Sequence, residues 1–468
     1  MLRAVVLFAL APLVGCSEPV ADFCDLTHPC ASAAKPRCDV ATRTCMPADD
    51  GGQLDAGGAD AAFDAMGDAA PPDAGCGSSA ACVDPAAPIC GAGGACRGCQ
   101  GGAECAARAP ATPVCHPDGR CVECRASADC AAKLDTPVCD LSTSTCTACA
   151  ADAQCPYFCD SLTGRCATEP EIVFVDNMGP HCPTPLGGAG SAADPYCEIQ
   201  KAVDSLGIRR YVHVRAGMYA PVLVLGASFR LRAEQGARVQ GVGAGGAGVA
   251  LQGGTVLIDG LQVLGGNVSL TAGASVTLRH VKVQGATNYY GLACDQSTLV
   301  TDAVAILSNS QGGLRLNGCT YTIVNSVIAS NGSASSTFGG VWILTPGAGS
   351  SFVNNTVVGN TATANIEAGV RCSGAAPVTN SVVWWNSYRD ASTTCAVTSS
   401  NLGQAVTGQG NISQSPSFKD RTGGDFHYDV GSAGIDTAAS IGAPDHDFDG
   451  YPRPYGTAPD MGAFEWHP

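Results

Sequence analysis

The chain has 468 residues, a formal net charge of −16 and a charged-residue content of only 14%. A chain this acidic is a poor candidate for binding nucleic acid, because neutralising phosphates requires clustered lysine and arginine. The 27 cysteines and 59 glycines argue against a cytosolic helical protein and indicate disulfides, turns and short β-strands in an oxidising compartment.

Residues 1–15 have the organisation of a removable signal peptide. A basic start is followed by an apolar run, Ala4–Leu13, that is too short to remain as a membrane span. The segment Leu13–Cys16 resembles the lipobox of bacterial lipoproteins, in which the cysteine is lipidated and becomes the mature N-terminus. The resemblance implies a lipid anchor at Cys16 and, with Ser17 after it, attachment to the outer membrane, facing the periplasm or the surface. A plain secretory signal is the alternative.

A cysteine-rich repeat, C-x5-C-x(3–9)-C-x(5–6)-C, occurs once in residues 16–45 and four times in residues 76–170. The five sets are Cys24, Cys30, Cys38 and Cys45; Cys76, Cys82, Cys90 and Cys96; Cys99, Cys105, Cys115 and Cys121; Cys124, Cys130, Cys139 and Cys146; and Cys149, Cys155, Cys159 and Cys166. Repeats this short bury little apolar surface, so we expect disulfides to replace a core. Each repeat has three possible pairings, and the sequence does not choose among them.

Two further features belong to this N-terminal part. The C-x2-C pairs formed by Cys96 with Cys99, Cys121 with Cys124, and Cys146 with Cys149 resemble zinc ligands. The export signal favours disulfides over zinc. Residues 46–75 contain seven aspartates and no lysine, arginine or glutamate, so we expect a disordered acidic linker. Linker and repeats together would hold a head away from a membrane.

Residues 171–468 show a recurring pattern of three short strands separated by glycine and asparagine. Similar segments begin at Gly291, Gly313, Gly340 and Gly369, which lie 22, 27 and 29 residues apart. Three strands per 20–30 residues are typical of the coils of a parallel β-helix. We expect inward columns of apolar residues and a turn column that reads Asp259, His280, Asp302, Asn325, Asn355 and Asn380.

Three motifs resemble the pectate-lyase-like right-handed β-helix superfamily, including its surface-repeat members. They are Val173-Phe174-Val175-Asp176 with Ile199-Gln200-Lys201-Ala202, Val212-His213-Val214 with Gly217-Met218-Tyr219, and the ending Asp447-Phe448-Asp449-Gly450 with Met461-Gly462-Ala463-Phe464-Glu465. The resemblance covers about residues 172–466 and implies an all-β fold. It also implies that an enzyme of this type would be a lyase, hydrolase or epimerase acting on acidic polysaccharides.

Active sites in that superfamily use outward residues of the first strand of each coil. By strand alternation this column holds Ala250, Ser269, Ala293, Arg315, Trp342 and Arg371. The column contains no acid, and only Asp295 and Asn317 lie beside it, which argues against catalysis. Arginine can hold carboxylates or sulfates, and an exposed tryptophan can stack on a sugar ring. Our candidate glycan-binding site therefore consists of Arg315, Trp342, Arg371, Asp295 and Asn317. The alternative is that these side chains are only solvated.

Six cysteines remain in the head, and coil spacing predicts how they pair. Cys294 and Cys372 share an inward column three coils apart, roughly 14 Å, which is beyond disulfide reach. Their partners must come from neighbouring coils, so we expect Cys294–Cys319 and Cys372–Cys395, with Cys182–Cys197 in the entry segment.

Near the C-terminus, Asp445, Asp447 and Asp449 with Gly450 resemble the start of a calcium loop. Gly456 stands where such a loop places its bidentate glutamate, and a capping turn that uses Arg453 is the favoured alternative. We expect no cofactor apart from this possible Ca²⁺. Three functions remain open: a surface adhesin or glycan binder, a polysaccharide-processing enzyme, and a purely structural envelope protein.

Overall fold

The computed structural model describes residues 76–160, 163–179, 182, 187–241 and 246–468. It also gives the backbone of a hairpin formed by β1 (Arg37–Asp39) and β2 (Thr44–Met46), in which Cys38 lies opposite Cys45. The chain divides into two compact units, Met1–Ala74 and Gly75–Pro468. The predicted lipidation site Cys16 and residues 47–75 of the predicted linker lie outside the described residues. None of the helices in the described ranges is both long and apolar enough to cross a bilayer.

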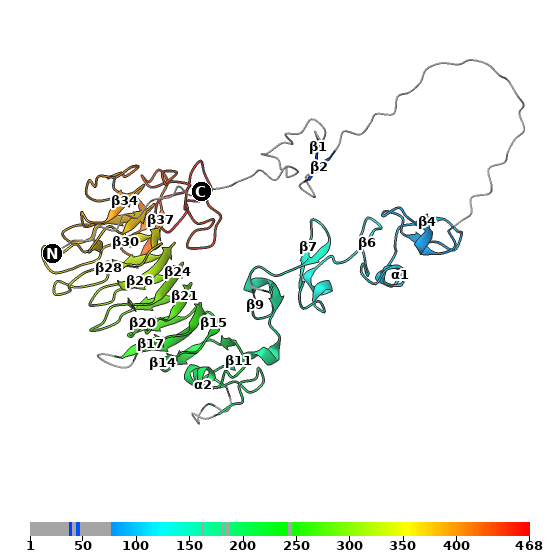
Figure 1. The fold of residues 1–468 in the computed structure, drawn as a ribbon, viewed down its shortest axis with the longest axis horizontal. Coiled ribbons are helices and arrows are strands. Elements are labelled where there is room, and N and C mark those ends of the chain that lie inside the picture. The colour runs from blue at the N-terminus through cyan, green and yellow to red at the C-terminus, as the bar shows by residue number, and fades with distance from the viewer. Residues whose placement is uncertain are drawn as a thin grey trace, which may run out of the picture. The chain divides into compact units, whose positions relative to one another are not determined.

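Each of the four described cysteine repeats consists of a short helical segment followed by a two-stranded antiparallel hairpin (Figure 1, blue to cyan). The helical segments are η1 (Ser79–Ala81), α1 (Gly102–Arg108), η2 (Ser127–Cys130) and η3 (Asp152–Gln154). The hairpins are β3 (Ile89–Cys90) with β4 (Cys96–Arg97), β5 (Val114–Cys115) with β6 (Cys121–Val122), β7 (Val138–Asp140) with β8 (Thr145–Thr147), and β9 (Cys159–Asp160) with β10 (Arg165–Cys166).

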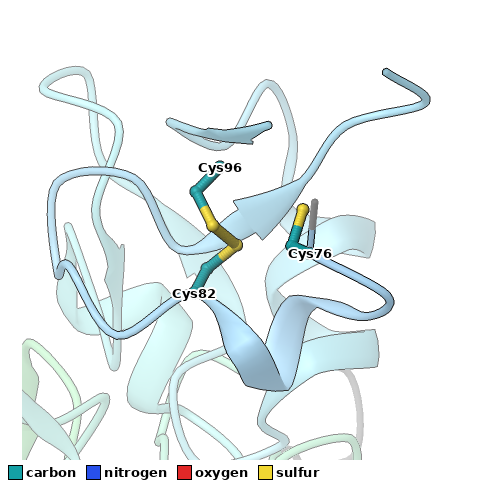
Figure 2. Close-up of side chains that lie close together, drawn as sticks. All are labelled: Cys76, Cys82 and Cys96. Atoms are coloured by element: carbon teal, nitrogen blue, oxygen red, sulfur yellow. A yellow bond between two sulfur atoms is a disulfide. The ribbon is translucent and has the colours of Figure 1, made fainter. Parts of the chain in front are cut away.

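All four repeats use the same disulfide connectivity, first cysteine to third and second to fourth. The bridges are Cys76–Cys90, Cys82–Cys96, Cys99–Cys115, Cys105–Cys121, Cys124–Cys139, Cys130–Cys146, Cys149–Cys159 and Cys155–Cys166. The third and fourth cysteines are cross-strand neighbours, as Cys90 and Cys96 show. Side chains of opposed residues project from the same face, so both bridges of this repeat run from the hairpin to the cysteines on either side of the preceding helical segment. Figure 2 shows the bridge between Cys82 and Cys96.

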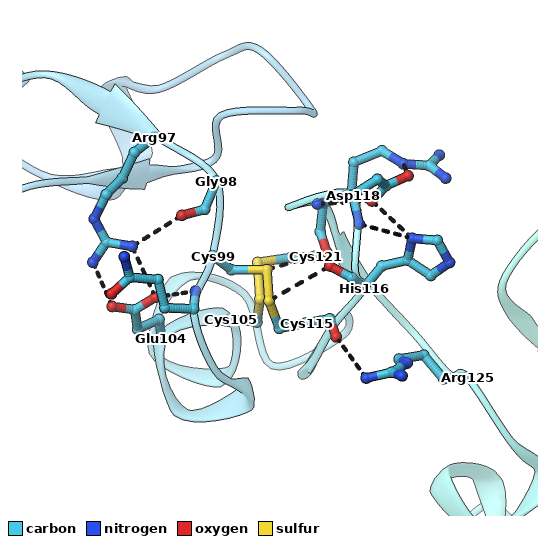
Figure 3. The surroundings of a disulfide bond; sticks show 12 residues. Arg97, Gly98, Cys99, Glu104, Cys105, Cys115, His116, Asp118, Cys121 and Arg125 are labelled. Carbon is cyan, nitrogen blue, oxygen red and sulfur yellow. Dashed lines mark hydrogen bonds and ion pairs between the residues drawn. A yellow bond between two sulfur atoms is a disulfide. The ribbon is translucent and has the colours of Figure 1, made fainter.

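The disulfides also account for the C-x2-C pairs. Cys96 is bonded to Cys82 and Cys99 to Cys115, so the two cysteines of this pair end one repeat and begin the next. The close sulfur groups of each repeat are bonded disulfide sulfurs, which are not free thiolate ligands for zinc (Figure 3). The preference for disulfides over zinc is confirmed for these four repeats.

From Ile172 onward the chain forms a parallel β-solenoid with three sheets (Figure 1, green to orange). This confirms the predicted all-β fold and its parallel β-helix architecture. Sheet 1 contains β14 (Val222–Leu225), β17 (Ala247–Gln252), β20 (Asn267–Thr271), β23 (Leu292–Asp295), β26 (Leu314–Val324), β28 (Val341–Pro346) and β31 (Val370–Cys372). Sheet 2 contains β11 (Ile172–Val175), β12 (Tyr211–Val214), β15 (Phe229–Ala233), β18 (Thr255–Asp259), β21 (Ser275–Arg279), β24 (Thr298–Asp302), β29 (Ser351–Val353), β32 (Pro377–Thr379) and β34 (Ala396–Thr398). Sheet 3 contains β13 (Gly217–Tyr219), β16 (Ala237–Gln240), β19 (Gln262–Leu264), β22 (Lys282–Gln284), β25 (Ala305–Leu307), β27 (Val327–Ala329), β30 (Thr356–Val358), β33 (Val382–Trp384) and β35 (Asn401–Leu402).

Smaller elements complete the described chain. Strand β26 is long enough to belong to both sheet 1 and sheet 2. The short helices η4 (Glu169–Glu171) and α2 (Ile199–Asp204) flank β11, and the hairpin β36 (Phe418–Asp420) with β37 (Asp425–Tyr428) follows the last coil.

Strand alternation places the expected apolar columns inside the solenoid. In sheet 1, one buried column is Leu292, Leu314, Val341 and Val370, and the next is Cys294, Leu316, Ile343 and Cys372. The structure forms Cys294–Cys319, Cys372–Cys395 and Cys182–Cys197, the three pairs derived from the sequence. Each of the first two bridges links an inward residue of sheet 1 to the chain one coil later, because only adjacent coils lie within disulfide reach.

The predicted turn column is partly wrong. The left-handed residues between sheets 2 and 3 include His280, Asn325, Asn354 and Asn380, with φ between 49° and 53°. The prediction named Asn355, whereas the left-handed residue is its neighbour Asn354. It also named Asp259 and Asp302, which are the last residues of β18 and β24 and lie one position before the left-handed column. Asn355 instead points inward, where its Nδ2 donates to the carbonyl of Ile323 at 2.8 Å. Two adjacent asparagines look alike in sequence, and only the coil register separates the left-handed one from the buried one.

A second asparagine column lies between sheets 3 and 1, and three of its four members are buried. It contains Asn309, Asn331, Asn360 and Asn386 in consecutive coils. The Nδ2 of each of the first three donates to the Oδ1 of the next asparagine, for example Asn309 to Asn331 at 2.9 Å and Asn331 to Asn360 at 3.0 Å. The same amides satisfy buried backbone carbonyls, such as that of Ile306. The ladder therefore keeps the inner side of these turns free of unpaired polar groups.

The C-terminal segment packs along the left-handed column. Asn325 donates to the carbonyl of His446, Asn354 to that of Asp460, and Asn380 to that of Ala439, at 3.0, 2.8 and 2.8 Å. The segment also shares a small apolar cluster with sheet 3 through Ala463 and Phe464. It thereby closes one side of the solenoid.

The last cysteine repeat packs against the start of sheet 2. Phe158 and Tyr157 join an apolar cluster with Phe174 and Tyr211. Arg232 donates to the carbonyl of Tyr157 at 2.6 Å. Repeat and solenoid therefore share one interface made of aromatic packing and arginine hydrogen bonds.

Candidate ligand-binding faces

The predicted outward row of sheet 1 is present in the structure. Strand pairing places Ala293, Arg315, Trp342 and Arg371 opposite one another in four successive coils. The side chains of the last three are half-buried. The alternation of sheet residues sufficed to predict this register, because each side chain in a strand faces away from its neighbours.

Arg315 is already bound within the protein. Its Nη1 donates to both carboxylate oxygens of Asp295, at 2.8 and 2.9 Å, and Asn317 Nδ2 donates to the same carboxylate at 2.8 Å. The Arg315 guanidinium also lies 5.8 Å from the ring centre of Tyr290. Asp295, Asn317 and Arg315 thus form one neutralised cluster, and Arg315 is less available to a ligand than its place in the row suggested.

Trp342 and Arg371 form the other half of the row. The Arg371 guanidinium lies over the Trp342 ring at 4.9 Å, and its Nη1 donates to the carbonyl of Thr337 at 2.8 Å. Phe338 packs on Trp342 with ring centres 5.5 Å apart, and Tyr290 packs on Phe338 at 5.1 Å. Aromatic residues of the loops between sheets 3 and 1 therefore cover part of the row.

Tyr290 and Phe338 were missed by the sequence reasoning. Each lies in the loop that enters a sheet 1 strand, with Tyr290 directly before Gly291 and Phe338 directly before Gly339. An aromatic residue at the entry to two coils was the available signal. We call Tyr290, Phe338, Trp342, Arg315 and Arg371 the aromatic–arginine face.

This face offers binding chemistry more readily than proton transfer. Asp295 is the one acid among the residues predicted for the site, and its two carboxylate oxygens already accept hydrogen bonds from Arg315 Nη1. Within the described ranges, no group of three histidine or carboxylate ligand atoms gathers closely enough to suggest a metal site. What remains is a cation stacked on an aromatic ring, which suits an anionic or polyhydroxylated ligand.

The three aspartates of the predicted calcium loop point to different partners. Asp447 is buried and accepts backbone N–H groups of Asp449, Tyr451 and Glu465 at 3.0, 2.8 and 2.9 Å. Asp449 contacts His427 at 2.6 Å, and Asp445 contacts His446 at 2.6 Å. This arrangement fits the alternative of a capping turn, because the carboxylate oxygens of Asp447 are engaged by the backbone.

Comparison with known proteins gives the following results. A crystal structure of pectate lyase Pel9A is similar to this chain with a TM-score of 0.29 and 12% sequence identity, over 63% of this chain and 96% of that chain. No protein-family model matches the sequence. No curated protein matches it either.

Proposed function

We propose that this protein is an envelope-anchored binding protein whose β-solenoid holds acidic glycans on the aromatic–arginine face. The observation that carries the proposal is the stack of Arg371 on Trp342 at 4.9 Å. The aromatic ring fixes the plane of the guanidinium, while only its Nη1 is used in a hydrogen bond within the described chain. An arginine held in this way presents its other N–H donors with little loss of side-chain entropy on binding.

The number and the contacts of the carboxylates at this site favour binding over catalysis. A hydrolase needs two carboxylates at a defined separation, and a lyase needs a base beside a site that stabilises the charge of the substrate. The single acid predicted for the site, Asp295, is held by Arg315 and Asn317. Acid–base chemistry would require that cluster to open, whereas ligand binding beside Arg371 does not.

The first experiment compares Arg371→Gln and Trp342→Ala with the native protein on trigalacturonate and on neutral maltotriose. We expect each variant to bind the acidic probe about tenfold more weakly, because one charge-assisted contact or one stacking platform is lost. Native binding should also weaken as salt is added. Arg238→Gln is the matched control, since Arg238 is exposed on sheet 3. Equal binding by all four proteins would direct us to the structural function instead.

Anchoring is tested separately at Cys16. Cys16→Ser removes the thiol that would carry the lipid, so the variant should remain unprocessed or leave the detergent phase in a phase-separation assay. The proposed anchor is wrong if this variant still partitions into detergent as the native protein does. The mutation lies far from the aromatic–arginine face in sequence, so glycan binding by the purified variant should be unchanged.

A further inference from the structure

A cavity on the outer face of sheet 2 is lined by three arginines. Strand pairing aligns Tyr211, Arg230, Leu257 and Thr277 across β12, β15, β18 and β21. A cavity of about 370 Å³ lies over this column and is also lined by Arg210 and Arg279. We call it the arginine pocket. Its volume falls within the range of roughly 300–1,000 Å³ that is usual for small-ligand sites.

The arginines of the pocket are incompletely paired. Arg210 and Arg279 are exposed, and neither side chain makes a hydrogen bond or ion pair within the described part of the chain. Arg230 donates to the carbonyl of Cys159 and lies 3.4 Å from Asp152, but its Nε is buried without an acceptor. A buried donor without a partner is unfavourable, and a bound water or ion is one explanation for it.

Other charged groups around the pocket leave it cationic. Asp160 of the last cysteine repeat lines the same cavity. An adjoining cavity of about 610 Å³ shares Arg230 and Arg279 and adds Arg232, His280, Asp152 and Asp259. Asp259 is hydrogen-bonded to His280 at 2.8 Å, and Asp152 faces Arg230. Against the net charge of −16 of the chain, three arginines that line one cavity form a local concentration of positive charge.

The pocket walls indicate the kind of anion. Guanidinium groups bind planar carboxylates and sulfates through paired hydrogen bonds. The hydroxyl-bearing residues Ser228, Thr255 and Thr277 line the cavity together with Leu257, and Ser228 Oγ accepts the backbone N–H of Thr255 at 3.0 Å. Hydroxyls beside an apolar surface suit a sugar ring, which has polar edges and apolar C–H faces. We infer that the arginine pocket binds the carboxylate or sulfate group of an acidic sugar, at a site separate from the aromatic–arginine face.

The test uses Arg210→Gln/Arg279→Gln in the full chain. Neither arginine holds another element, so the variant should fold, which its melting temperature will check. Arg230 is left intact, because it also fastens the last cysteine repeat to sheet 2. The probes are trigalacturonate for carboxylates, a sulfated trisaccharide for sulfates, and maltotriose as a neutral control. Arg238→Gln again controls for a change of charge alone.

Binding at the two faces is separated by repeating the titrations in an Arg371→Gln background. The pocket is supported if this background retains binding of an acidic probe and the double substitution then weakens it about tenfold or more. The acidic probe that binds more tightly identifies the anionic group, carboxylate or sulfate, that the pocket prefers. The inference is overturned if the double substitution has no effect in the Arg371→Gln background, if maltotriose binds equally well, or if that background binds neither acidic probe at millimolar concentration. The last two results could also arise if the aromatic–arginine face does not bind acidic glycans. Binding at that face is judged separately, by comparing Arg371→Gln with the native protein.

Discussion

Arg453 Nη1 donates to Glu465 Oε2 at 2.7 Å, and both side chains are almost completely buried, with 0% and 1% exposed. The same guanidinium donates to the backbone carbonyls of His446, Asp460 and Gly462. One side chain therefore ties together three parts of the C-terminal segment that closes the solenoid.

Removing the charge of Arg453 should strongly lower the stability of the fold. Arg453→Met leaves Glu465 buried without its counter-ion, so we expect the free energy of unfolding to fall by about 3–5 kcal/mol. Adding Glu465→Gln should restore part of the loss, because the unpaired charge disappears. Denaturant unfolding measures both, with the exposed Arg238→Met as a control that should change stability by less than about 0.5 kcal/mol. A loss no larger than that of the control would show that the segment does not depend on the pair.

The stability of the C-terminal region should depend on pH through His427. Its ring contacts Asp425 at 2.5 Å and Asp449 at 2.6 Å, and the hydrogen bond with Asp449 is the largest cause that raises the pKa of His427 above 6.5. A raised pKa means that the stabilisation is fully present below about pH 6.5 and is lost as the pH rises through the raised value. His427→Gln should therefore lower the melting temperature more at pH 5.5 than at pH 8.5. Equal losses at the two pH values would contradict this coupling.

The internal asparagine ladder should be sensitive to a single break. Asn331 accepts from the backbone N–H of Asn309 and donates to the carbonyl of Ile306, and all of these groups are buried. Asn331→Ala strands them without partners, so we expect a loss of about 2–4 kcal/mol. Chemical denaturation of this variant, with the exposed Gln235→Ala as control, measures the difference. A loss as small as that of the control would mean that water replaces the amide.

Reduction should unfold the cysteine repeats before the solenoid. In the repeat from Cys124 to Cys146, the buried apolar cluster consists of the four half-cystines themselves. The solenoid instead has one long core of valine, leucine and isoleucine columns. Mild reductant should abolish hydrogen-exchange protection in residues 76–166 while the solenoid strands stay protected. Protection that survives in fully reduced repeats would show that they fold without their disulfides.

The sequence by itself determined the coil architecture and its register. Side chains alternate at every strand residue, so the row of Arg315, Trp342 and Arg371 followed from counting along each strand. The partners of Cys294 and Cys372 followed from the coil spacing in the same way. Both deductions depend on local periodicity and on the fixed distance between stacked strands, which do not require knowledge of the loops.

Tertiary structure alone decided what surrounds those side chains. The pairing of Arg315 with Asp295, the packing of Phe338 on Trp342, and the first-to-third connectivity of the cysteines depend on loop conformation, which no strand period encodes. The three arginines of the pocket lie up to 69 residues apart, from Arg210 to Arg279, and meet only because successive coils stack on sheet 2. Asn354 and Asn355 differ for the same reason: one backbone angle sends one side chain outward and the other into the core, and that angle is set by the neighbouring coils.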